Sequence, residues 1–131
     1  NPDIHVTAVE PEGSLYSETK GEDVEEGEYK IEGIGTHNLE TNELFDPDLV
    51  DEVLQVPDRR AHDELKRLAA EEGQLVASSA GAASAAARNV AERIRDGELD
   101  VPHESVVTVF ADSSERYLSK GVYRSFEEWE G

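Results

Sequence analysis

The 131-residue chain has no cysteine and no methionine, and it has no apolar run of the roughly 18 residues that a membrane span needs. Without cysteine, a disulfide framework and thiol catalysis are both excluded. Neither a membrane helix nor a signal peptide is indicated, so we expect a cytoplasmic protein. Because a reading frame begins with methionine, its absence favours a cleaved product or a segment of a longer protein.

Basic residues are also scarce, with 12 Lys and Arg against 31 Asp and Glu and a formal net charge of −19. A polyanion would be repelled, so nucleic acid is not expected as a partner. The acidic residues are spread along the chain instead of forming one tail. This pattern suits a halophilic cytoplasm, where salt screens the repulsion between carboxylates. An ordinary acidic protein is the alternative.

The N-terminal half of the sequence indicates strands joined by polar connections. An alternating run predicts a strand over residues 4–9, and the acidic, glycine-containing stretch 17–28 predicts an exposed connection. Asp46 followed by Pro47 is typical of a helix start. The apolar residues within 49–54 therefore predict a short helix and then a strand.

The C-terminal half favours two helices and another strand. The first helix is expected to be capped by Asp58 and to end at Gly73. Ser79 opens an Ala-rich helix whose small residues permit close packing. A buried strand is expected over 105–111, and residues 112–115 have the spacing of a capping box. The expected apolar stripe of the Ala-rich helix is Ala83, Ala87, Val90 and Ile94.

This alternation of strands and helices predicts an α/β fold with a mainly parallel sheet, flanked by helices in three layers. Ligands of such sheets bind beyond the carboxyl ends of the strands. Ser79 follows one short apolar run, and Asp112 and Ser113 follow the next. At both places the side chains either cap a helix or face a ligand.

Other chemistry finds little support in the sequence. The turn Gly33-Ile34-Gly35 would let backbone approach a ligand, although a plain turn is the alternative. The histidines have no paired spacing, so no metal is expected. Gly-x-Ser-x-Gly is absent, so a serine hydrolase is not expected either.

Four segments, taken in order, resemble the fold-type II pyridoxal-phosphate enzymes of the cysteine synthase and cystathionine β-synthase family. They are Asn1 to Ser14 with its Glu10-Pro11-Glu12-Gly13-Ser14 turn, Lys30-Ile31-Glu32-Gly33-Ile34-Gly35, Glu72 to Gly81, and Asp112-Ser113-Ser114-Glu115-Arg116-Tyr117-Leu118-Ser119. The resemblance covers nearly the whole chain. It implies that residues 1–131 are the C-terminal segment of the large cofactor-binding domain.

The resemblance also implies pyridoxal 5'-phosphate as cofactor. The family's serine matching Ser79 contacts the pyridine nitrogen, the segment matching Asp112 and Ser113 lies near the ring, and Gly33-Ile34-Gly35 borders the substrate. The reaction implied is β-replacement on serine or O-acetylserine by sulfide or a thiol, giving cysteine or cystathionine. A homodimer is expected for the complete enzyme.

The family's Schiff-base lysine, its substrate loop and its phosphate loop have no counterpart in this sequence. We therefore expect no catalytic residue here and no activity from this chain without the missing N-terminal part. The lysines Lys20, Lys30, Lys66 and Lys120 lie in other contexts. The different-class alternative is a non-catalytic acidic binding or scaffold module that retains the fold.

Overall fold

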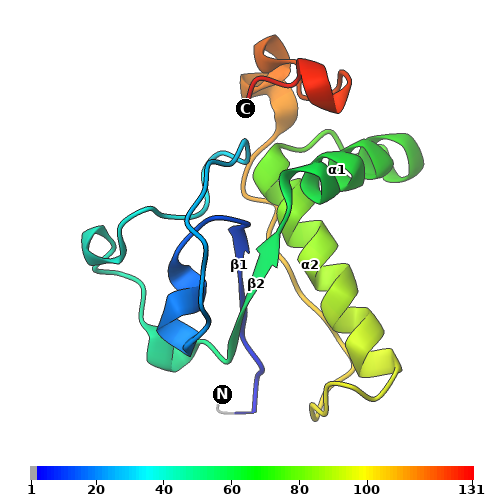
Figure 1. The fold of residues 1–131 in the computed structure, drawn as a ribbon. Helices are drawn as coiled ribbons and strands as arrows, with labels where there is room; N and C mark the ends of the chain where they lie inside the picture. The colour runs from blue at the N-terminus through cyan, green and yellow to red at the C-terminus, as the bar shows by residue number, and fades with distance from the viewer. Residues whose placement is uncertain (1–2) are drawn as a thin grey trace.

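A computed structural model describes residues 3–131, which are arranged around a small parallel sheet (Figure 1). Strands β1 (Thr7–Pro11) and β2 (Glu52–Val56) form the sheet. Helix α2 (Ser78–Arg95) lies along one side of it, and α1 (Asp58–Glu72) packs across α2. A 3-10 helix, Tyr16–Lys20, lies on the other side. The predicted α/β arrangement, with a parallel sheet flanked by helices, is confirmed.

The start of the sheet is held by the Glu52 carboxylate. Thr7, its partner in the parallel register, donates to Glu52 at 2.9 Å, and Arg93 of α2 donates to both carboxylate oxygens at 3.0 and 2.9 Å. Burial alone would raise the pKa of Glu52, but hydrogen bonds from His5, Thr7 and Arg93 outweigh it and lower the pKa. The strand predicted over 4–9 is found as β1, but it begins later, at Thr7, and Ile4 before it is exposed.

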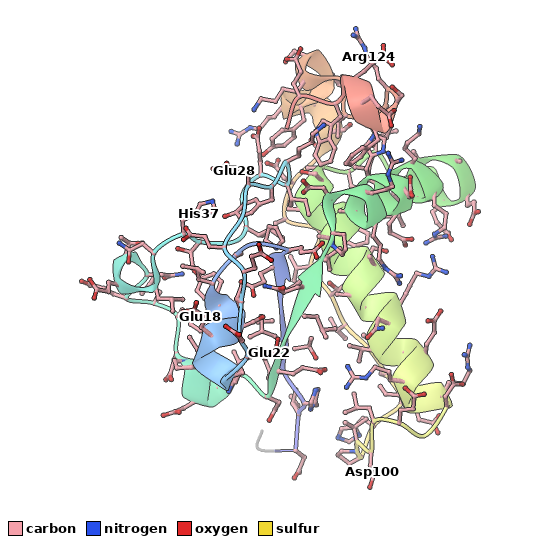
Figure 2. The ribbon with its side chains drawn as sticks, viewed as in Figure 1. Glu18, Glu22, Glu28, His37, Asp100 and Arg124 are labelled. Carbon is pink, nitrogen blue, oxygen red and sulfur yellow. The ribbon has the colours of Figure 1, made fainter. Side chains whose placement is uncertain are left out.

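The connection predicted to be exposed over residues 17–28 is not wholly exposed, because its first residue, Ser17, is buried. The buried Glu10 carboxylate accepts the backbone N–H groups of Tyr16 at 2.7 Å and Ser17 at 2.9 Å. It also accepts the Ser17 hydroxyl at 2.6 Å and the Gln55 amide at 3.1 Å. These bonds compensate the cost of burying a charge. Farther along, side chains such as Glu22 lie in solvent as predicted (Figure 2).

The short helix predicted after Asp46 is confirmed as the 3-10 helix Pro47–Leu49, with the Asp46 carboxylate accepting the N–H of Asp48. The Asp58 cap is wrong. Pro57 is the N-cap of α1, and the Asp58 carboxylate instead accepts two backbone N–H groups from residues 30 and 31. Gly73 ends α1 as predicted, with a positive φ of 67° that glycine adopts without strain.

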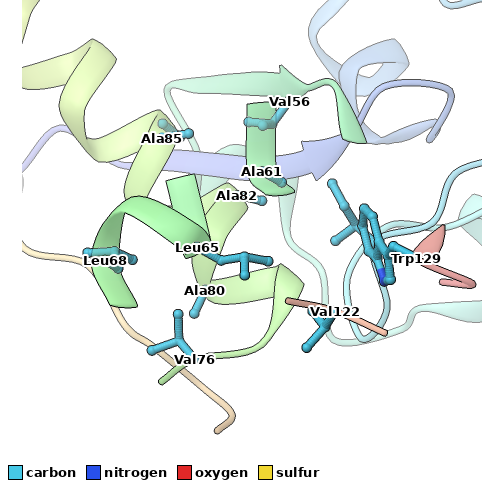
Figure 3. Close-up of a cluster of buried hydrophobic side chains, with 12 residues drawn as sticks. Val56, Ala61, Leu65, Leu68, Val76, Ala80, Ala82, Ala85, Val122 and Trp129 are labelled. Atoms are coloured by element: carbon cyan, nitrogen blue, oxygen red, sulfur yellow. The ribbon is translucent and has the colours of Figure 1, made fainter. Parts of the chain in front are cut away.

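Helices α1 and α2 approach closely because α2 presents small residues to α1. A Cβ added to Gly81 would lie 2.3 Å from the carbonyl oxygen of Ala61, so no larger residue fits without moving the helices. The predicted close packing is confirmed (Figure 3). The buried apolar cluster comprises Ile31, Val56, Ala61, Leu65, Leu68, Val76, Ala80, Ala82, Ala85, Ala86, Val122 and Trp129.

The predicted stripe of α2 lies outside this cluster. Ala83, Ala87, Val90 and Ile94 line a hollow of about 380 Å³ between α2 and the segments near His5 and residues 101–108. Of the four, only Val90 is buried. The helical spacing predicted the helix correctly but not its buried face, which is formed by Ala82, Ala85 and Ala86.

The buried strand predicted over 105–111 is wrong. This segment runs back along α2 without strand structure (Figure 1), and Val107 and Val109 are 90% and 74% exposed. Within residues 3–131 no strand lies beside it, so its backbone has no ladder partner and its apolar side chains have no second layer. In this same described part, no helix is long and apolar enough to cross a membrane.

Candidate functional site

Ser79, Asp112 and Ser113 are brought together where α2 begins. Val76 forms an isolated antiparallel bridge with Ser113 just before the helix. The N–H of Ala77 donates to the carbonyl of Asp112 at 3.2 Å. Residues predicted from two separate strand ends therefore lie beside one another, next to the first turn of α2.

Ser79 does not cap α2. The N-cap residue is Ala77, and no side chain caps that end. Ser79 is only 8% exposed, and its hydroxyl has no hydrogen-bond partner in the described part of the chain. The Ser79 oxygen is not among the fully buried, unpaired polar atoms of the described residues, so water or a ligand can reach it and supply the partner. The capping alternative is wrong, and the ligand contact stays a prediction.

Asp112 is engaged by neighbours on its own segment. Tyr117 donates its hydroxyl to one carboxylate oxygen at 2.9 Å, and the N–H of Ser113 donates to the other at 3.0 Å. The hydrogen bond to Asp112 raises the pKa of the Tyr117 phenol. The capping box predicted over 112–115 does not form. Instead Ser113 is the N-cap of a 3-10 helix, Ser114–Arg116, without a side-chain cap.

The loop Gly33-Ile34-Gly35 is held at both ends. On one side the N–H of Glu32 donates to the hydroxyl of Ser78, the first residue of α2, at 3.3 Å. On the other side the N–H of Thr36 donates to the hydroxyl of Ser14 at 2.8 Å. The first of these bonds places the loop beside the start of α2, next to Ser79.

Both glycines of this loop have backbone conformations that favour glycine, with φ of 84° at Gly33 and 90° at Gly35. Open space surrounds Gly33, whereas a Cβ on Gly35 would lie 2.8 Å from both the Pro11 ring and the Tyr29 hydroxyl. Gly35 therefore packs against Pro11 at the end of β1, whereas no other atom lies within 4 Å of the Cβ position of Gly33. The predicted turn is present, and the approach of its backbone to a ligand stays a prediction.

Two hollows among the described residues lie elsewhere. One is the apolar hollow along α2, and the other is an open groove of about 610 Å³ whose walls carry Arg59, Arg60, Arg67 and Arg88. Neither contains Ser79, Asp112 or the glycine loop. We place the candidate site at the start of α2 because Ser79, Asp112, Ser113 and the glycine loop lie near one another there.

Two residues at this site were not predicted from the sequence. Ser78 links α2 to the glycine loop, although the pattern singled out its neighbour Ser79. Tyr117 fixes the Asp112 carboxylate, and its only sequence signal is its place in the family-like segment that begins at residue 112.

Comparison with known proteins places this geometry in a family. Residues 1–112 match the family described as "Pyridoxal-phosphate dependent enzyme". The chain belongs to this family of pyridoxal-phosphate dependent enzymes. Pyridoxal phosphate is accordingly the cofactor to test against the residues described above.

Individual relatives show which members of the family the chain is similar to. The chain is 37% identical over 122 residues to a cysteine synthase of Helicobacter pylori strain J99, covering 93% of this chain and 36% of the relative. It is 37% identical over 123 residues to an O-acetylserine dependent cystathionine β-synthase of Bacillus subtilis strain 168, covering 94% and 36%. The crystal structure of an O-acetylserine dependent cystathionine β-synthase from Helicobacter pylori superposes with a TM-score of 0.72 at 38% identity, again over 93% and 36%.

The chain thus spans about a third of the length of these relatives. Its residues fit one part of a pyridoxal-phosphate site. The unpaired hydroxyl of Ser79 suits the pyridine nitrogen, which needs a single polar partner at the ring edge. The Asp112 carboxylate is less free, because Tyr117 already occupies one of its oxygens.

Proposed function

We propose that this chain is the C-terminal segment of the large cofactor-binding domain of a cytoplasmic β-replacement enzyme. The substrates would be serine or O-acetylserine and either sulfide or a thiol, and the products cysteine or cystathionine. The named relatives include enzymes of both kinds, which supports the reaction class. The observation that carries the proposal is Ser79 at the start of α2, a mostly buried residue whose hydroxyl has no hydrogen-bond partner within the described residues and remains accessible to a ligand.

In this proposal Ser79 hydrogen-bonds the pyridine nitrogen of the cofactor. When bound, pyridoxal phosphate supplies an electron sink for bonds to the substrate α-carbon. A neutral hydroxyl does not hold the nitrogen protonated as a carboxylate would, so Ser79 keeps that sink weak. Asp112 and Ser113 would lie near the ring, and the glycine loop would face the amino-acid substrate with backbone groups.

The lysine that binds the cofactor would come from the remainder of the enzyme, which we expect to be a homodimer. The contacts of the lysines in this chain support that assignment. Lys20 donates to the Pro47 carbonyl at 2.6 Å, and Lys66 donates to the Arg124 carbonyl at 3.3 Å. Lys30 and Lys120 likewise donate to carbonyl groups of the C-terminal residues. A nucleophilic lysine needs a free amine, and these ammonium groups are all engaged.

The experiment replaces Ser79 in the complete enzyme. Ser79→Ala should lower turnover per folded molecule, because the ring loses its nitrogen contact. Ser79→Asp should abolish β-replacement and change the cofactor absorbance spectrum, because a carboxylate keeps the nitrogen protonated. Ser84→Ala is the matched control, since Ser84 is also a buried serine of α2 but hydrogen-bonds Glu64.

Kinetics and spectrum should be measured at equal folded fraction by circular dichroism. Wild-type values in both Ser79 variants would remove the cofactor contact. A complete wild-type protein with neither cofactor absorbance nor β-replacement would instead favour the acidic binding module that retains the fold.

A further inference from the structure

We propose that the C-terminal segment, residues 114–131, positions the glycine loop Gly33-Ile34-Gly35 relative to the start of α2, and that Lys30 is the main positioning residue. The inference rests on the proposed function, in which this loop faces the substrate. The matched family region ends at residue 112, before this segment begins. The structure gives the segment contacts on both sides of the candidate site.

Lys30, which shortly precedes the glycine loop, hydrogen-bonds to the C-terminal segment. Its ammonium group donates to the carbonyl of Trp129 at 2.8 Å and to that of Phe126 at 3.2 Å. The same ammonium lies 4.7 Å from the centre of the Phe126 ring, within the range of a cation–π contact. Because Lys30 is only three residues before Gly33, these contacts fix the direction in which the chain enters the loop.

Lys120 of the C-terminal segment makes a second contact with the residues before the loop. The ammonium of Lys120 pairs with the Glu32 carboxylate and donates to the carbonyl of Gly131 at 3.0 Å. Gly131 packs against Lys30 so closely that an added Cβ would lie 2.9 Å from the Lys30 Cα. The residue immediately before Gly33 is therefore held by the C-terminal segment as well.

The C-terminal segment also hydrogen-bonds to residues near the start of α2. Tyr123 donates its hydroxyl to the carbonyl of Val76 at 3.1 Å, two residues before α2. Tyr117 donates to Asp112, which in turn accepts the N–H of Ala77. One short stretch of chain thus touches the residues that lead into the loop and the residues that lead into Ser79.

The segment can act as a fixed support because it is packed on α1. Trp129 is buried and stacks on His62, with ring centroids 5.3 Å apart and an interplanar angle of 16°. Phe126 meets the same ring edge-on at 5.7 Å. Val122 and Trp129 belong to the main apolar cluster (Figure 3). Displacing the segment would expose these side chains, so its position is stabilised by the core.

The matched variants are Lys30→Met and Lys66→Met. Both lysines donate to a backbone carbonyl of the C-terminal segment, but Lys66 does so from α1 and does not contact the loop. In Lys30→Met, the NMR order parameters of the Gly33, Ile34 and Gly35 amides should fall from about 0.85 to below about 0.6. Lys66→Met should leave them unchanged. Lys30→Arg, which keeps a cationic donor, should restore them.

The same variants in the complete enzyme give a functional measurement. Lys30→Met should raise the KM for the amino-acid substrate about tenfold with a smaller change in kcat, because the loop binds substrate less well. Lys66→Met should change neither value by more than about twofold. In this chain by itself, fluorescence of its single tryptophan, Trp129, reports whether the segment stays docked. If Lys30→Met does not fold, Lys120→Met, which releases Glu32, replaces it.

Order parameters below about 0.6 in the wild-type loop, or equal values in Lys30→Met and Lys66→Met, would overturn the positioning role. An equal effect of the two variants on KM would overturn it as well. Absence of β-replacement in the complete wild-type enzyme would defeat only the proposed function, since the order parameters decide positioning without catalysis.

Discussion

The buried Glu64 carboxylate offers a quantitative test of how α1 and α2 are joined. Its side chain is 8% exposed and accepts hydrogen bonds from Arg67 and from two α2 residues, Ser84 and Arg88, the last two at 2.8 Å. Burial would raise the pKa of Glu64, but the hydrogen bonds from Arg67, Ser84 and Arg88 outweigh it and lower the pKa to about 2. The ionised carboxylate is thus stabilised by the fold.

The magnitude follows from proton linkage. Each pKa unit corresponds to about 1.4 kcal/mol, so a fall from 4.5 to about 2 corresponds to about 3 kcal/mol of folding free energy. Because the folded-state pKa is depressed, this contribution is present above the ordinary pKa. It is lost as the pH falls from about 4.5 towards about 2. Glu64→Gln removes the charge while keeping the shape.

Urea unfolding followed by circular dichroism should therefore show Glu64→Gln about 3 kcal/mol less stable than wild type at pH 7, a midpoint shift of about 1 to 3 M. The gap should narrow below about pH 4. Glu71→Gln is the control, because Glu71 also pairs with Arg67 but is 62% exposed. Exposed pairs contribute only about 0 to 1 kcal/mol. A difference for Glu64→Gln that is small at pH 7, or constant from pH 7 to pH 3, would refute the reasoning.

Two further predictions concern the surface and the helix pair. Because the net charge is −19, the thermal midpoint should rise from low to molar potassium chloride, and a midpoint independent of salt would remove the halophilic interpretation. Gly81→Ala should cost about 1 to 3 kcal/mol in urea unfolding because its Cβ overlaps the Ala61 carbonyl, even though alanine favours helix. An unchanged or higher midpoint would show that the helices separate freely.

The sequence predicted those elements whose signals are local. The helix ending at Gly73, the Ala-rich helix after Val76 and the turn at Gly33 and Gly35 all depend on spacing, propensity or a positive φ, and all are found. The strand over 105–111 failed because a strand is completed by a neighbour, and residues 3–131 place none beside it. Its β-branched sequence gives no information about whether that neighbour is present.

Polar side chains were predicted less well because several of them bind partners far away in sequence. Asp58 has the local signature of a cap, yet its carboxylate accepts the N–H groups of Lys30 and Ile31. Glu10 likewise bonds to Ser17 and to Gln55 on the neighbouring strand. A short-range pattern ranks capping first because it sees only nearby donors. Ser79 and Asp112 do lie near each other as predicted, but the expected reason was wrong. An isolated antiparallel bridge between Val76 and Ser113 brings them together, and not the aligned ends of two parallel strands.

The acidic composition and the candidate site are connected through the lysines. Acidic residues outnumber basic ones by 31 to 12, so carboxylates are abundant partners for the lysines. Each lysine nevertheless donates to a backbone carbonyl, and Lys120 also pairs with the Glu32 carboxylate. Such bonds to carbonyls have fixed geometry, whereas exposed ion pairs are weak and easily screened. Salt that screens the surface should therefore leave Lys30 bound to Phe126 and Trp129. The site can remain ordered under the conditions in which the acidic surface is best tolerated.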